Sequence, residues 1–407
     1  MGDIKDDIVR VGDGSSLIQD IRSYREKTSQ NIFSPFDTRK REVGIEGDKA
    51  HSLTAHLSDF HQNDQPASPV QNQSRHVLGI IEEFDNNHLP YVAACKELGV
   101  RYKIIDISGP DGIQVVRDCG CNAFLTWPSF KVSIWKRMFD ERLKVMAEEM
   151  HQTIYPTCNE MWLNESKLRM SYWLEANGIP HCRTWVFYTR GEALEFAQNA
   201  DLPLVAKCDM GSRSAGVEIL RSRSAAVRYV LQRFGKGMVC RGADDRDREW
   251  GSVFFQEFLP EAAEWRMIRI DESYFGHQKL KGGEFHSGSG KVGWLDPPRT
   301  LLDFVRELTD NAGYTAMNVD IFETPDGRYL VNEIQSHFAA YLESQMYIND
   351  RPGRYLYDYS DGEWRFEEGV FCRNSCCNLR VKALLKLLRQ RAFPSSFREE
   401  RLPSPSR

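Results

Sequence analysis

The spacing of hydrophobic and polar positions changes several times along the chain, and each change predicts an element. Residues 1–74 are polar and end in HQNDQPASPVQNQS, which can bury little apolar surface, so we expect a flexible leader. The apolar run HVLGII then predicts a buried strand from His76 to Ile81. A helical stretch, HLPYVAACKEL, ends at Gly99, and the strand YKIIDIS follows. This order is a βαβ unit.

The βαβ unit opens a Rossmann-like domain that we place at residues 75–155. It carries no G-x-G-x-x-G motif, so we do not expect a nicotinamide or flavin dinucleotide. AFLTWP, the long helical segment SIWKRMFDERLKVMAEEM and the strand-like TIYPT complete the domain.

A second block begins with NESKLRMSYWLEANGIP, which predicts a helix that Asn164 caps and that Gly178 and Pro180 end. The strand-like runs TWVFY, PLVAK, GVEIL, SVFFQEFL and WRMIRI follow. The last part, residues 351–407, contains the basic, amphipathic segment LRVKALLKLLRQR. We expect this segment to pack on its own domain, and weak contact with an acidic membrane surface is the alternative.

The stretch NVDIFETPDGRYLVNEIQS, residues 318–336, places acids in runs that should be apolar. TPDG is a strong turn signal between two strand-like runs, so the stretch predicts a β-hairpin. With a two-residue loop, Asp320 lies opposite Val331, and Asp320 and Glu333 become diagonal neighbours on one face. A register slip of one residue would send the two acids to opposite faces.

Gln335 lies on the same predicted face as Asp320 and Glu333. Three oxygen-bearing side chains at this spacing can hold one or two Mg²⁺ ions, which prefer carboxylate and carbonyl oxygens. The alternative is an edge hairpin whose acids are only solvated.

The segment PLVAKCDMGSRSAGVEIL places a strand ending in Lys207 before a loop that contains Gly211 and Gly216. Glycines let backbone amides approach phosphate oxygens, and Ser212 and Ser214 add hydroxyl donors. The loop lacks the Lys and Ser or Thr of a P-loop and leads into a strand. It is therefore a glycine-rich lid over phosphates or a long surface turn.

In FFQEFLPEAAEWRMIRI an apolar strand stops at a short acidic connection and then restarts. Such an interrupted strand is suited to binding a flat ring. Backbone groups from Glu257 to Leu259 would meet an adenine edge, and Glu264 a ribose hydroxyl. Pro260 has no amide hydrogen, so the donor would be Phe258 or Leu259. Two strands with an acidic loop are the alternative.

The composition excludes several classes of protein. The chain has 407 residues, 41% hydrophobic and 27% charged, which suits two or three soluble domains. A net charge of −5 gives no basic field for nucleic acid. The ten cysteines lack paired metal spacing and suggest reduced thiols in the cytoplasm, with a zinc site as a minor alternative. We expect neither a signal peptide nor a membrane span.

The order of these segments is more specific than any one of them. Lys167 lies thirteen residues before Pro180, and PLVAK with its glycine loop, QEFLPEAAEWR and D-x12-E-x-Q follow. This order resembles the ATP-grasp superfamily of carboxylate-amine ligases, and QEFLPEAAEWR is similar to its glutamate-adding peptide ligases. The resemblance covers about residues 76–345. It implies two α+β subdomains that clasp a nucleotide within residues 156–350, with a lid subdomain at about 182–258.

The resemblance also implies roles for single residues. Lys167 and Lys207 would contact ATP phosphates, and residues 211–216 would form the mobile loop. Glu257, Phe258 and Leu259 would hold adenine and Glu264 the ribose. The metal ligands would be Asp320, Glu333 and Gln335, binding Mg²⁺ or alternatively Mn²⁺. Gln335 stands where the family usually has Asn, so its arm is one methylene longer.

Positively charged residues near the reacting groups would neutralise negative charge there. The candidates are Arg266, Lys279 and Lys291, with Lys281 and His286 in the same region. The segment EFHSGSGK resembles the substrate loop of the glutamate-adding ligases, in which a basic residue approaches the acyl phosphate. Exposed lysines that are only solvated are the alternative.

The function that the resemblance implies is ATP-dependent ligation. Such enzymes transfer the γ-phosphoryl group to a carboxylate, and an amine then attacks the acyl phosphate. A kinase of the same fold and a nucleotide-binding scaffold without turnover are the alternatives. An amino acid, a short peptide or a cell-envelope precursor would fit as substrate, and a homodimer would fit related folds.

Overall fold

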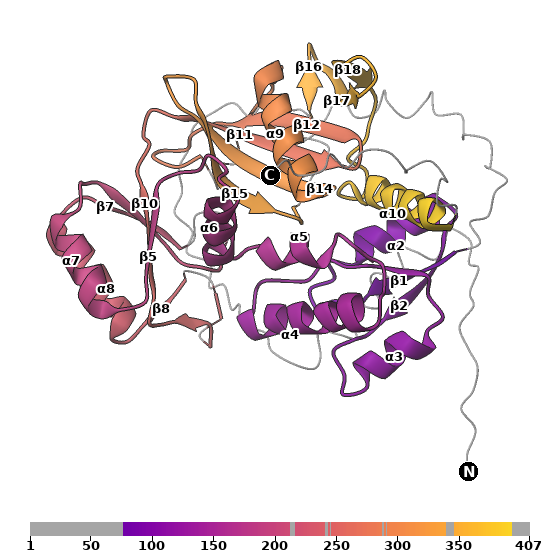
Figure 1. Ribbon diagram of the computed structural model, residues 1–407, viewed down its shortest axis with the longest axis horizontal. Coiled ribbons are helices and arrows are strands. Elements are labelled where there is room, and N and C mark those ends of the chain that lie inside the picture. Colours follow the sequence, from indigo (N-terminus) through magenta and orange to yellow (C-terminus); the bar gives the residue numbers. More distant parts are fainter. Residues whose placement is uncertain are drawn as a thin grey trace, which may run out of the picture. The chain divides into compact units, whose positions relative to one another are not determined.

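The computed structural model describes residues 76–211, 216–240, 243–244, 246–286, 289, 291–338 and 346–392. The leader expected at residues 1–74, Ser212, Ser214 and the end of the basic tail lie outside these residues. Within the described part, three larger sheets and a two-stranded ribbon form with their helices (Figure 1).

The first sheet is parallel, with the strand order β2-β1-β3-β4. Its strands are β1 (Val77–Ile81), β2 (Arg101–Ile105), β3 (Ala123–Leu125) and β4 (Ile154–Tyr155). The connecting helices are α2 (Leu89–Glu97), α3 (Gly112–Asp118), α4 (Ser133–Lys144) and the π-helical turn η3 (Val145–Glu149). Four of the five residues of β1 are buried, as expected for a strand covered on both faces. The predicted parallel α/β sheet is confirmed.

Two short helices connect the first sheet to the rest of the chain. The first, α5 (Cys158–Leu163), begins with a capping box between Thr157 and Glu160. The second, α6 (Lys167–Ala176), is capped by Ser166, whose hydroxyl accepts the Arg169 amide. The prediction that Asn164 caps this helix was wrong, because the Asn164 side chain instead accepts the amide of His337 at 3.1 Å.

The second sheet is antiparallel, with the order β5-β10-β6-β7. Its strands are β5 (Thr184–Phe187), β6 (Leu204–Lys207), β7 (Val217–Leu220) and β10 (Val253–Glu257). Helices α7 (Arg190–Asn199) and α8 (Arg223–Phe234) share an apolar core with it, in which Phe196 stacks on Phe255 (Figure 1). The short ribbon of β8 (Met238–Val239) and β9 (Arg248–Glu249) follows α8.

The third sheet has the main order β15-β14-β11-β12-β17-β16. Its strands are β11 (Ala263–Ile270), β12 (Ser273–Lys279), β14 (Ala316–Glu323), β15 (Tyr329–Gln335), β16 (Tyr347–Ile348) and β17 (Arg351–Asp358), with β13 (Val292–Gly293) on β12 and β18 (Glu363–Glu368) on β17. Helix α9 (Arg299–Ala312) buries Leu301, Leu302 and Val305 in the core of this sheet and ends at Gly313, whose φ is +67°.

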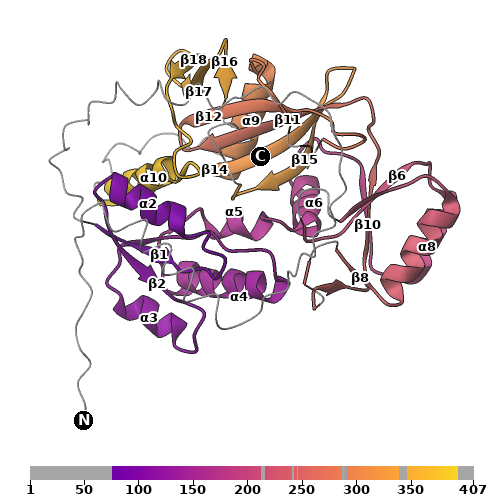
Figure 2. The same cartoon turned by 180° about the vertical axis from the view of Figure 1, so that it is seen from behind.

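The basic C-terminal segment forms helix α10 (Cys377–Ala392), which lies beside α2 in both views (Figures 1 and 2). Val381, Leu384 and Leu388 of α10 are buried in the core of the first sheet. The helix therefore packs against the first sheet and helix α2. None of the helices in the described ranges has the length and apolar character needed to cross a bilayer.

Candidate functional site

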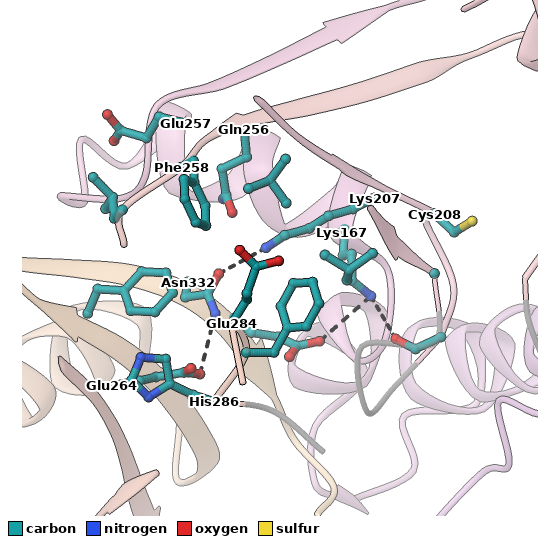
Figure 3. A pocket seen from close by; sticks show the side chains of 18 of the residues that line it. Lys167, Lys207, Cys208, Gln256, Glu257, Phe258, Glu264, Glu284, His286 and Asn332 are labelled. Atoms are coloured by element: carbon teal, nitrogen blue, oxygen red, sulfur yellow. Dashed lines mark hydrogen bonds and ion pairs between the residues drawn. The ribbon is translucent and has the colours of Figure 1, made fainter. Parts of the chain in front are cut away.

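A cleft opens between the second and third sheets. Including the solvent in its mouth, it has a volume of about 850 Å³. Its walls come from β6, β7 and β10 on one side and from β11, β14 and β15 on the other (Figure 3). The lining residues that the sequence singled out are Lys167, Lys207, Gly211, Gly216, Glu257, Phe258, Leu259, Glu264, Lys281, His286 and Glu333.

The glycine turn forms one wall of the cleft. All four residues of β6 are buried, so the strand fixes Lys207 at its end. The Cys208 amide then donates to the carbonyl of Gly216 at 2.8 Å, which closes the base of the turn. Gly211 has φ near +130°, a backbone conformation that L side chains rarely adopt. Ser212 and Ser214, predicted hydroxyl donors, lie outside the described residues.

Lys167 connects the first turn of α6 to the glycine turn. Its Nζ donates to the Gly211 carbonyl at 2.8 Å and lies 3.8 Å from Glu333 (Figure 3). Burial disfavours the ammonium, but Glu333, Glu165 and Asp209 outweigh this effect and raise the pKa of Lys167. Lys167 is therefore a buried positive charge aimed into the cleft.

Lys207 reaches the opposite wall. Its Nζ donates to the Asn332 side-chain oxygen at 2.9 Å, and the Asn332 amide lies 3.4 Å from Glu264 (Figure 3). Burial lowers the pKa of Lys207. An anionic ligand between these walls would compensate this buried charge better than a neutral amide does.

The predicted adenine hinge follows the end of β10. The Glu257 amide donates to the Arg183 carbonyl at 2.9 Å, and the Glu257 carboxylate accepts the Arg183 amide at 2.7 Å. These two hydrogen bonds hold the end of β10 in place. Because the Glu257 amide already donates to Arg183, it is not available to a ligand. The amides of Phe258 and Leu259 remain as the candidates for binding a ring edge, because Pro260 has none.

The hairpin of β14 and β15 has a different register from the predicted one. Asp320 pairs directly with Glu333, not with Val331. The turn is one residue longer than expected, since Thr324 bonds with Arg328, and a β-bulge adds Asn332 to β15. Each irregularity shifts the register by one residue, so together they keep the two acids on one face and bring them opposite each other.

Asp320 lies in a buried ion cluster. Its carboxylate has no exposed surface and accepts Arg266 at 2.9 and 3.0 Å and Lys279 at 2.9 Å. Lys279 also pairs with Glu264. Burial would raise the pKa of Asp320, but the two cations outweigh it and hold that pKa far below its usual range.

The cluster changes what can be expected of three predicted site residues. Asp320, Arg266 and Lys279 pair with one another and are not among the residues that line the cleft. Asp320 could reach a metal ion only after giving up one of these cations. Arg266 and Lys279 therefore hold a carboxylate in this structure, and their catalytic roles remain predictions.

The oxygen atoms on this face suit a hard cation. Glu333 lines the cleft, and Gln335 donates its amide to Glu333 at 2.9 Å, which turns the glutamine nitrogen toward the acid. Asn318 pairs with Gln335 across the strands, and its buried side-chain oxygen has no partner within the described chain. Carboxylate and amide oxygens are ligands that Mg²⁺ accepts, so the donor set fits this ion.

The remaining predicted cations differ in position. Lys281 and His286 line the cleft, whereas Lys291 does not. The His286 ring bonds with the carbonyls of Lys279 at 2.6 Å and Ala262 at 3.2 Å, contacts that hold this part of the loop against the sheet. Ser287, Gly288 and Gly290 of this loop lie outside the described residues.

Several residues of the site gave no signal in the sequence. Asn332 enters the cleft only because of the bulge, and Phe322 lines it from β14. Glu165 has φ of +64° and is 4% exposed, and one of its carboxylate oxygens has no partner among the described residues. Burial and the charge of Glu333 raise the pKa of Glu165 to about 7. The positive φ of a non-glycine residue cannot be read from sequence.

Comparisons with known proteins give structural neighbours only. No family model matches the chain, and no curated protein matches it. An N5-carboxyaminoimidazole synthetase from Staphylococcus aureus complexed with ADP has 10% identity and a TM-score of 0.49, over 70% of this chain and 83% of that one. A RimK domain ATP-grasp protein from Sphaerobacter thermophilus has 13% identity and a TM-score of 0.43. The match covers 64% of this chain and 90% of that one.

A third neighbour, N5-carboxyaminoimidazole ribonucleotide synthetase from Thermotoga maritima, has 15% identity and a TM-score of 0.45, over 64% of this chain and 68% of that one. Likenesses at these identities and TM-scores do not by themselves establish a family or an activity.

Proposed function

We propose that the chain is an ATP-dependent ligase of the ATP-grasp type, which activates a carboxylate as an acyl phosphate for attack by an amine. The observation that carries the proposal is the meeting of separate sequence segments around one cleft. Lys167, Lys207, the hinge at residues 257–259, Glu264 and Glu333 come from different elements and all line it. Their order in the sequence is the order that the ATP-grasp resemblance requires.

In this proposal, each wall of the cleft binds a different part of the nucleotide. Lys167 and Lys207 neutralise the triphosphate, which the glycine turn covers with backbone amides. The Phe258 and Leu259 region receives the adenine edge, and Glu264 the ribose. Bound nucleotide would displace the neutral Asn332 amide from Lys207 and give that buried ammonium an anionic partner.

Glu333 would hold Mg²⁺ at the cleft wall, with the side-chain oxygens of Asn318 and Gln335 on the same face as further candidate ligands. When bound, the ion would neutralise charge on the phosphate oxygens. The protein's own contribution is to align reactants and stabilise charge. Arg266 and Lys279 stand beside these oxygens and are suited to balance the charge of a phosphorylated carboxylate.

A hydroxylamine trap distinguishes the ligase from a kinase. Incubation with Mg-ATP, a candidate carboxylate and hydroxylamine should yield a hydroxamate, because hydroxylamine attacks an acyl phosphate. A phosphorylated alcohol would give none. ADP release without hydroxamate, together with a phosphorylated hydroxyl compound, would replace the ligase proposal with the kinase.

A further inference from the structure

Two cysteines from different segments lie side by side behind the glycine turn. The sulfurs of Cys208 and Cys240 and a carboxylate oxygen of Glu249 all lie within 4.8 Å of one another. Cys208 follows β6, Cys240 follows β8, and both are buried. Cys208 is also among the residues that line the cleft, with its sulfur pointing away from Lys167 and Lys207 (Figure 3).

Gly216 allows the two sulfurs this proximity. A Cβ at this position would come within 2.7 Å of Cys208 Cβ and 2.9 Å of Cys240 Sγ. Contacts this short require the neighbouring atoms to move. The second glycine of the turn therefore has a packing role at the thiols in addition to any contact with phosphate.

A buried guanidinium completes the cluster. Arg233 is 1% exposed, donates to Glu249 at 2.9 Å, and has its Nη1 4.0 Å from Cys208 Sγ. A guanidinium beside a thiol favours its thiolate, and Arg233 lies next to the Cys208 sulfur. This position assigns Cys208 as the nucleophilic member of the pair.

The same surroundings disfavour a metal ion. One Glu249 oxygen accepts Asp209 N and Arg233, both at 2.9 Å, and the other accepts Met210 N at 3.0 Å. A divalent ion would have to displace these donors and sit beside a guanidinium that already balances the local negative charge.

We propose that Cys208 and Cys240 form an oxidation site in which hydrogen peroxide converts the dithiol to a disulfide. The Cys208 thiolate attacks the peroxide oxygen, and the O–O bond breaks to give a sulfenic acid and hydroxide, which takes up a proton to become water. The Cys240 thiol then attacks the sulfenic sulfur and releases a second water. The two sulfurs together lose two electrons, and the peroxide gains them.

Disulfide formation would disturb the cleft. The Cys240 thiol lies 3.4 Å from the Met210 carbonyl, and the next residue, Gly211, holds Lys167 through its carbonyl. Oxidation removes the thiol hydrogen from the first contact and ties the base of the glycine turn to the segment after β8. We expect nucleotide to bind less tightly to the oxidised protein.

Other neighbouring cysteines serve as internal controls. Cys119 and Cys121 lie close together, with the Cys121 amide 3.4 Å from Cys119 Sγ, and Cys372 interacts with Cys376. Both pairs are local in sequence. Because Arg233 lies 4.0 Å from the Cys208 sulfur, we expect the cleft pair to oxidise first.

The test treats the full-length protein with increasing hydrogen peroxide and maps linked peptides by mass spectrometry. A non-hydrolysable ATP analogue with Mg²⁺ is titrated before oxidation, after it, and after dithiothreitol. We expect a Cys208–Cys240 link, affinity about tenfold weaker, and recovery on reduction. The variant Cys240→Ser should keep its affinity through the same treatment.

Two results would overturn the proposal. One is linkage of the other cysteine pairs while Cys208 and Cys240 stay reduced, and the other is a mapped link that leaves affinity unchanged. If Cys240→Ser does not fold, the proposal is tested on the wild-type protein instead. Bound ATP analogue should slow formation of the Cys208–Cys240 link in that protein. If the reduced protein binds no analogue, the ATP proposal fails, and peptide mapping still decides whether this pair is oxidised.

Discussion

Asp320 lies directly opposite Glu333 across the β14–β15 hairpin, yet the two carboxylates face different surroundings. Asp320 is fully buried and held by Arg266 and Lys279, whereas Glu333 lines the cleft near Lys167. We propose that the two acids have different roles: Asp320 holds the two cations, and Glu333 offers its carboxylate to a ligand.

Replacing Glu333 tests this division. Glu333→Ala should lower ATP turnover on the order of a hundredfold or more, because a preorganised charged group is lost from the site. The measurement is the steady-state rate of ADP formation, with circular dichroism to confirm folding. Asp326→Ala, an exposed acid in the turn of the same hairpin, is the control and should leave the rate unchanged. Near-normal turnover in folded Glu333→Ala would contradict the role.

Replacing Lys207 tests the phosphate side of the cleft. Lys207→Met should raise the Kd of an ATP analogue by about tenfold or more, since a charge-assisted hydrogen bond to phosphate is lost. Calorimetric titration measures the change. Lys144→Met, on the exposed face of α4, serves as a matched loss of charge. Equal affinities for wild type and Lys207→Met would remove this lysine from the site.

The buried ion cluster should control stability. Arg266→Met leaves the Asp320 carboxylate buried with one cation fewer, and we expect the free energy of unfolding to fall by about 3–5 kcal/mol. Urea unfolding measures it. Arg137→Met breaks an exposed pair with Glu141 and should change stability little. A small effect of Arg266→Met would show that the cluster relaxes without it.

The same cluster predicts an acid dependence of stability. The folded pKa of Asp320 is depressed, so its contribution is present above the unfolded pKa of about 3.9 and is lost as pH falls toward the folded pKa. The wild type should therefore lose stability below about pH 4 more steeply than Asp320→Asn. Unfolding free energies of both proteins across that range test the sign, and parallel curves would refute it.

The glycine turn offers a steric test. Gly216→Ala places a Cβ 2.7 Å from Cys208 Cβ and should weaken nucleotide binding, because the base of the turn must shift. Gly191→Ala is the matched control, since a Cβ there meets nothing within 4 Å. Thermal unfolding and analogue titration of both variants separate a binding effect from global destabilisation. Unchanged binding by Gly216→Ala would show that the turn tolerates the shift.

Much of the architecture could be predicted from sequence because its signals are local. The runs around β1, β6 and β10 are short and apolar, and turn residues bound them. The two lysines, the hinge residues, Glu264 and Glu333, which the sequence order singled out, also line the cleft. The roles assigned to these residues remain predictions until they are tested.

The site details that sequence missed depend on contacts between distant segments. The bulge at Asn332 and the extra turn residue shifted the hairpin register twice, and no single-strand pattern encodes such shifts. The pairing of Asp320 with Arg266 follows from the register of β11 against β14. The meeting of Cys208 and Cys240 likewise requires the end of β6 and the end of β8 to come together in the fold.

A crystal structure with Mg²⁺ and a non-hydrolysable ATP analogue tests the central claim most directly. The account predicts adenine at the amides of Phe258 and Leu259, phosphates between Lys167 and Lys207, and the metal ion on Glu333. A nucleotide bound elsewhere, or a cleft that stays free of nucleotide at saturating analogue, would contradict it.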